Sequence, residues 1–77
     1  MAAKLIASPL VAGTLSVKIM AGKKGKAYLL GATGEQLRSY TLTAEVTELP
    51  LQDLRAGIYS LRVEAGSDVM VEQFIIP

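Results

Sequence analysis

The chain contains no histidine, no cysteine and no tryptophan among its 77 residues. Without histidine and cysteine, it lacks the commonest general base, the thiol nucleophile and the ligands of closed structural zinc sites. Without cysteine, no disulfide can supplement the small core that a domain of this length forms. These absences argue against an enzyme, and we expect neither a metal nor a cofactor.

The chain also lacks a large excess of charge of one sign, and it has no long apolar run. The formal net charge is +1, and the lysines and arginines are scattered, so no basic face for nucleic acid is indicated. No apolar run approaches the roughly 18 residues of a membrane-spanning helix. The aspartates and glutamates have no motif spacing, and no Asx-rich loop indicates a calcium site. We interpret these carboxylates as solvated charges of loops and strand edges.

Apolar residues are abundant instead. They make up 51% of the chain, and the mean hydropathy is +0.38. This is high for a small free-standing domain. It predicts either a well-filled core or an apolar surface that a partner or a neighbouring domain covers.

The apolar residues alternate with polar ones at a period of two. In "TLSVKI" the apolar side chains are Leu15, Val17 and Ile19, and in "GIYSLRVE" one face carries Tyr59, Leu61 and Val63. Glycine and proline turn signals separate such stretches. We therefore expect one domain, an all-β immunoglobulin-like antiparallel β-sandwich of about seven strands. The expected strands cover residues 3–7, 14–20, 26–32, 36–42, 44–49, 57–64 and 69–76.

The last stretch, "VMVEQFIIP", places Val69 and Val71 on one face and Phe74 and Ile76 on the other. A bulge near Glu72-Gln73 would reconcile the two halves. Pro77 cannot donate a ladder hydrogen bond, so this strand is expected at a sheet edge.

Three connections have interpretable sequences. "AGKKGKAY" lacks the glycine spacing of a phosphate-binding loop and is read as a hairpin loop with solvated lysines. A weak contact with an anionic glycan or a lipid headgroup is the alternative. "ATGEQL" predicts a hairpin turn in which Gly34 takes a positive φ. "PLQDLR" has the length of a single helical turn before Gly57.

Four aromatic residues are present, and they form no exposed row of the kind that binds carbohydrate. At least two of them are expected in the core. They are Tyr28, Tyr40, Tyr59 and Phe74.

The order of these stretches resembles a known family. "KLIASP", "GTLSVKI", "ATGEQL", "LPLQDLRAGIYSLRV" and a closing "VMVEQFIIP" follow one another as in the C-terminal sorting domain of the type IX (Por) secretion system of Bacteroidetes. The chain departs from the family pattern at Ser8, Glu35 and Glu72-Gln73. The most specific match is a motif whose residues are expected to serve as scaffold: Leu51, Leu54, Gly57, Ile58, Tyr59, Leu61 and Val63.

The resemblance implies a folded export signal with no chemistry of its own. Residues 1–77 would be the C-terminal sorting domain of a larger secreted protein. In that protein, the sorting domain would follow an N-terminal passenger. The outer-membrane translocon would carry the passenger from the periplasm to the cell surface or the medium, and a surface sortase would remove the domain. The resemblance also fits strand addition at an exposed edge. The segment expected to be recognised is Met70, Val71, Glu72, Gln73, Phe74, Ile75, Ile76 and Pro77.

Two other functions remain open from the sequence. An immunoglobulin-like or fibronectin-like structural or adhesion module of a secreted protein would share this fold, because a fold does not determine function. A small enzyme or glycan-binding module lacks convergent ionisable groups and exposed aromatics. Dimerisation through the edge strand is also open.

Overall fold

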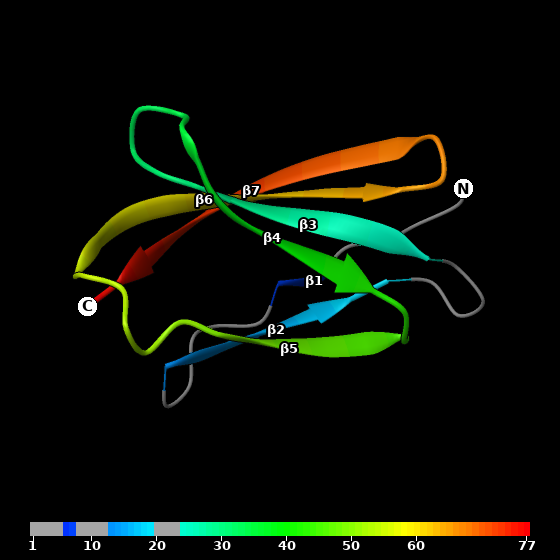
Figure 1. Ribbon diagram of the computed structural model, residues 1–77, viewed down its shortest axis with the longest axis horizontal. Helices are drawn as coiled ribbons and strands as arrows, with labels where there is room; N and C mark the ends of the chain where they lie inside the picture. Colours follow the sequence, from blue (N-terminus) through cyan, green and yellow to red (C-terminus); the bar gives the residue numbers. More distant parts are fainter. Residues whose placement is uncertain (1–5, 8–12, 20–23) are drawn as a thin grey trace.

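The computed structural model describes residues 6–7, 13–19 and 24–77, and these form two antiparallel β-sheets packed as layers (Figure 1). One sheet has the strand order β1-β2-β5, and the other has the order β4-β3-β6-β7. The predicted all-β sandwich is confirmed. The strands are β1 (Ile6–Ala7), β2 (Thr14–Lys18), β3 (Gly25–Leu30), β4 (Gln36–Leu42), β5 (Val46–Pro50), β6 (Gly57–Ala65) and β7 (Asp68–Ile76).

Short turns join two of the strand pairs of the larger sheet, β3–β4 and β6–β7. Between β3 and β4, the Gly31 N–H donates to the Glu35 carbonyl at 2.9 Å, and Gly34 has a φ of +90°. The predicted positive φ at this hairpin is therefore confirmed. Between β6 and β7, Gly66 has a φ of +61° in a two-residue turn. Such φ values are available to glycine at little cost, and this is why glycine occupies these turns.

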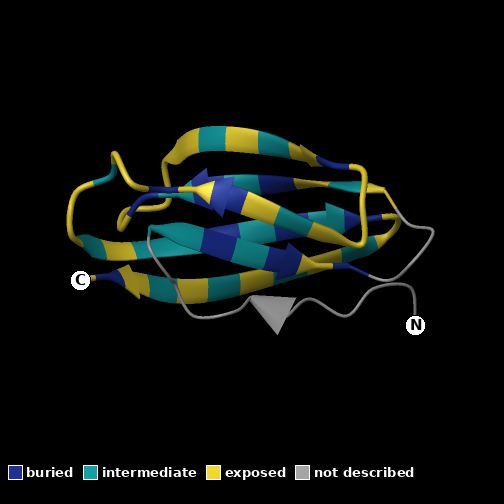
Figure 2. Cartoon of the chain, turned by 90° about the horizontal axis from the view of Figure 1, so that it is seen from below, coloured by how far each residue is buried: buried dark blue, intermediate teal, exposed yellow. Residues whose placement is uncertain are grey.

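The core lies between the two sheets and follows the predicted alternation. Figure 2 shows buried and more exposed residues alternating along the strands. No polar or charged residue is fully buried in the described part of the chain. Tyr40, Tyr59 and Phe74 pack against the core, which confirms a core role for at least two aromatics. The buried residues are Leu15, Val17, Ile19, Ala27, Leu29, Leu42, Leu49, Leu51, Leu61, Val63, Ala65 and Ile76.

The strand boundaries agree with the sequence-based ranges to within two residues for the last six strands. The first strand was expected over residues 3–7, and the described part of it is Ile6–Ala7. Residues 3–5 and the expected turn at Ser8-Pro9 lie outside the described residues.

The predicted bulge near Glu72-Gln73 is wrong. The β6–β7 register is unbroken from Gly57↔Ile76 to Ala65↔Asp68. The even-numbered residues of β7 therefore all face inward, and Glu72 is among them. The alternation looks broken in the sequence because the outward positions 69 and 71 carry apolar valines, while the inward position 72 carries a charge. A register shift does occur elsewhere, between Leu29 and Leu30 of β3.

Two of the predicted connections also differ from the structure. "AGKKGKAY" is not a hairpin loop, because β2 and β3 belong to different sheets. Lys24 and Lys26 are exposed as expected, while residues 20–23 lie outside the described part. "PLQDLR" forms no helical turn. It ends β5 and enters a tight turn in which the Leu54 N–H donates to the Leu51 carbonyl at 3.2 Å.

Candidate functional site

The strand β7 forms one edge of the four-stranded sheet, as its sequence predicted. It pairs with β6 along all nine of its residues. Among the described residues, no strand pairs with its other side. An edge of this length presents unpaired backbone donors and acceptors to a partner strand.

The two faces of β7 have different environments. On the inward face, Met70 and Phe74 pack against the core, and Ile76 is 8% exposed. The Phe74 ring stacks on Tyr59 of β6, with ring centroids 6.0 Å apart. On the outward face, the apolar side chains of Val71 and Ile75 are 59% and 66% exposed. The inward residues hold the strand on the core, and the outward residues are free to contact a partner.

Exposed apolar side chains concentrate on the outer face of the four-stranded sheet. Six large apolar residues of the described chain are exposed, and only Val46 of β5 belongs to the other sheet. The β6–β7 register directs the four that lie on these two strands to the same outer face, where Ile58 stands directly opposite Ile75. The fifth lies on β4, next to the register shift between β3 and β4. A concentration of this kind is typical of an interaction surface. These five residues are Leu37, Ile58, Val69, Val71 and Ile75.

Arg62 of β6 lies at the centre of this outer face. Its guanidinium carbon is 4.8 Å from the centroid of the Tyr28 ring. Its Nε lies 3.4 Å from Glu64 Oε2, which makes an ion pair without a hydrogen bond. Val71 of β7 stands opposite Arg62. A partner on this face would therefore contact the Arg62 guanidinium, which lies over the Tyr28 ring, as well as the apolar residues.

The "LPLQDLRAGIYSLRV" motif builds the turn from β5 into β6. Leu51, Leu61 and Val63 are at most 2% exposed, and Leu54 and Tyr59 pack against the same core. The Tyr59 hydroxyl donates to the Arg55 carbonyl at 2.8 Å, and this bond closes the turn. Gly57 begins β6 with a φ of +157°, a value that residues with a side chain rarely adopt. Of the seven motif residues, only Ile58 carries an exposed apolar side chain.

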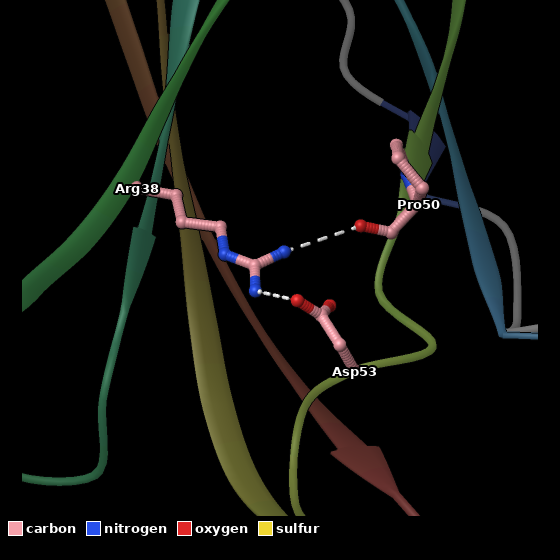
Figure 3. Close-up of polar contacts among 3 residues, drawn as sticks. All are labelled: Arg38, Pro50 and Asp53. Carbon is pink, nitrogen blue, oxygen red and sulfur yellow. Dashed lines mark hydrogen bonds and ion pairs between the residues drawn. The ribbon is translucent and has the colours of Figure 1, made fainter.

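Arg38 of β4 connects the two sheets at this turn (Figure 3). Its guanidinium donates to Asp53 Oδ2 at 2.6 Å and to the Pro50 carbonyl at 3.5 Å. The hydrogen bond from Arg38 lowers the pKa of Asp53 below its ordinary value of 3.8 and raises the pKa of Arg38. Sequence reasoning missed this pair, because the partners are 15 residues apart and no motif joins them.

This ion pair predicts a weak pH dependence of stability. A carboxyl whose pKa is lowered by folding stabilises the fold above its unfolded pKa, and this stabilisation is lost as the pH falls through the folded pKa. Asp53→Asn is therefore expected to lower the urea midpoint at pH 6 and to flatten its decline below pH 4. The effect should be small, because both side chains are solvated. An unchanged acid slope in the variant would contradict this assignment.

The described residues offer no metal-binding cluster. No three aspartate or glutamate residues among them converge in a way that could hold a metal ion. Within the same residues, no helix is long and apolar enough to cross a membrane. The notable features of this part of the chain are the edge strand and the apolar outer face, and both suit the binding of a partner.

Comparison with protein families gives the identity of this fold. The model of the family described as the secretion system C-terminal sorting domain matches residues 9–77. No sequence among curated proteins matches the chain. The family consists of sorting signals for type IX secretion and is not a catalytic family. Because the match covers the chain from residue 9 to its last residue, the chain belongs to the secretion system C-terminal sorting domains, which direct an attached protein to export.

Proposed function

We propose that the type IX translocon recognises this domain through Met70–Pro77, the C-terminal part of β7 and the residue after it. The observation that carries the proposal is a nine-residue edge strand whose outward face exposes Val71 and Ile75. The domain then acts as the export signal of the passenger on its N-terminal side. Membership in the sorting-domain family supports this role.

The hairpin geometry supports recognition by strand addition. A two-residue turn joins β6 to β7, so its flanking residues Ala65 and Asp68 form a hydrogen-bonded pair. Hydrogen-bonded and non-bonded pairs alternate along an antiparallel ladder. The backbone groups of odd-numbered β7 residues therefore point to the open edge, and the same residues carry the exposed apolar side chains. A strand added at this edge would gain backbone hydrogen bonds and apolar contacts from the same residues.

The later steps belong to the same proposal. After the passenger crosses the outer membrane, a sortase on the cell surface removes the domain. Residues 1–77 thus act as one C-terminal unit of a larger secreted protein, and they are a substrate of the machinery. The sorting role of the family supports this sequence of events.

The test is a secretion assay. The chain is fused to the C-terminus of a fluorescent reporter with its own periplasmic signal, in a bacterium with a working type IX system. Val71→Thr combined with Ile75→Thr is expected to reduce export roughly tenfold or more, since each loses apolar burial against the receptor. Threonine preserves the strand, because it is also β-branched. Reporter fluorescence at the cell surface and in the medium gives the readout.

The matched control is Val46→Thr. Val46 is 52% exposed but lies on the other sheet. The fusion that carries this substitution should therefore be exported as well as the fusion with the unaltered domain. Deleting residues 73–77 is a harsher test, because it also removes Phe74 and Ile76 from the core. If the folded, unaltered fusion stays in the periplasm, the sorting role is wrong, and a structural or adhesion module becomes the better account. If the double variant is exported at the normal level, recognition through β7 is contradicted.

A further inference from the structure

Glu72 occupies an unusual position in the edge strand. It belongs to the inward row of β7, between Met70 and Phe74, and it pairs with the fully buried Leu61. The residue is half-buried. Within the described part of the chain, its carboxylate has no hydrogen bond and no ion pair. A carboxylate in such a place is stabilised by a cation and opposed by a second anion or by further burial.

An added strand would bring one side chain close to this carboxylate. Because Glu72 forms a hydrogen-bonded pair with β6, its pair with a new antiparallel strand would be of the non-bonded kind. Residues in such pairs have Cα atoms about 4.5 Å apart, and their side chains share a face and lie closest. The residue opposite Glu72 therefore has a strong electrostatic influence on pairing.

A second copy of the chain is a poor occupant of this edge. Antiparallel pairing of two β7 strands about Glu72 would place the two carboxylates opposite each other. Shifting the register by two residues in either direction would place each carboxylate opposite Met70 or Phe74, where it would be buried further without a cation. An inward-pointing charge on an edge strand is a known means of preventing self-pairing.

We propose that Glu72 selects the strand that pairs with β7, favouring an extended antiparallel segment with a lysine or arginine opposite it over a second copy of the chain. The proposal rests on the proposed recognition through β7 and adds the chemistry of the partner. Glu72 thereby serves two purposes, since the same carboxylate disfavours self-association and rewards a basic partner strand.

The test uses three capped nine-residue peptides in which valine and threonine alternate. The central residue is lysine, glutamine or glutamate, and the valines share its face. Each peptide is titrated into the 77-residue chain, with binding followed by NMR and the register assigned from cross-strand contacts. We expect the order lysine, glutamine, glutamate, with Kd values for the extremes differing roughly 2- to 30-fold. The difference should shrink with added salt.

Two variants with the same change in net charge separate the inward face from general electrostatics. Glu72→Gln should abolish the preference among the peptides. Gln73→Lys changes the charge by the same amount on the outward face and should retain the preference. Glu72→Lys should reverse the order, so that the peptide with glutamate binds most tightly.

Several results would overturn the selection by Glu72. Equal binding of all three peptides, a preference that survives Glu72→Gln, or no binding at β7 would each do so. Concentration-dependent dimerisation through β7 would identify a second copy as the occupant and equally contradict the proposal. The secretion assay with Val71→Thr and Ile75→Thr remains independent of these results. If the double variant loses export and the peptides show no charge preference, recognition through β7 is retained. Only the selection of the partner strand by Glu72 is then rejected.

Discussion

Replacing Leu61 by alanine is expected to lower the free energy of unfolding by about 2–5 kcal/mol. Leu61 is fully buried at the middle of β6, between Leu29 of β3 and Glu72 of β7. The smaller side chain loses apolar transfer energy and leaves a cavity that surrounding strands fill only in part. A domain of this length has a total stability of about 4–12 kcal/mol. The substitution would therefore remove a large share of it.

Urea unfolding followed by tyrosine fluorescence measures the change. The control is Leu37→Ala, the same substitution at a site in β4 that is 46% exposed, where the cost should not exceed about 1 kcal/mol. Equal losses at both sites would contradict the described core. In the secretion assay, Leu61→Ala should reduce export only as far as it unfolds the domain. This result would distinguish a scaffold residue from a recognition residue. The Val71 and Ile75 variants should lose export although the domain stays folded.

Alternation along β2 and β6 was sufficient to predict which of their aliphatic residues enter the core. Leu15, Val17, Leu61 and Val63 are buried as their period of two required, because a strand with one wet face has no other way to bury apolar side chains. Turn chemistry was equally local, and Gly34 adopts the positive φ expected of it. These features depend on neighbours in sequence, and the sequence contains them.

Features that depend on distant neighbours could not be predicted. The strand order, and hence the crossing from β2 to the other sheet, is decided by pairing between segments far apart in the chain. The Arg38–Asp53 pair joins β4 to the β5–β6 turn, and neither residue type is informative alone. The inward position of Glu72 likewise depends on a distant neighbour. A charged residue is expected to face water, yet the unbroken β6–β7 register directs it inward.

Within the candidate site, the sequence predicted the edge strand but not the division of its residues between two faces. The expected recognition segment was a continuous run from Met70 to Pro77. The structure divides it into inward residues such as Phe74, which hold the strand, and outward residues such as Ile75, which are exposed. The expected bulge would have removed this division, and the unbroken register with β6 establishes it. Point substitutions on the outward face can therefore replace a deletion of the whole segment.

Gly25 is the second position at which a single substitution should have a large effect. It begins β3 and pairs with Leu42 on one side and Ala65 on the other. A Cβ atom at this position would lie 2.3 Å from the Glu64 carbonyl oxygen and 3.2 Å from the Ala65 Cα. The obstacle is backbone of the neighbouring strand, which cannot rotate away as a side chain can. We therefore expect Gly25→Ala to lower the free energy of unfolding by about 3 kcal/mol or more, at the upper end of the range for overpacking.

Gly34→Ala is the matched control, because a Cβ at Gly34 would meet no atom within 4 Å. Its cost should come only from the backbone, since its φ is +90°, and should be roughly 1–2 kcal/mol. Amide hydrogen exchange distinguishes the two causes. Gly25→Ala should weaken protection along the β3–β6 ladder, whereas Gly34→Ala should affect only the β3–β4 turn. A smaller loss at Gly25 than at Gly34, with the β3–β6 amides still protected, would mean that the two strands lie farther apart than described. The glycine would then be a loop residue, as its place in "AGKKGKAY" first indicated.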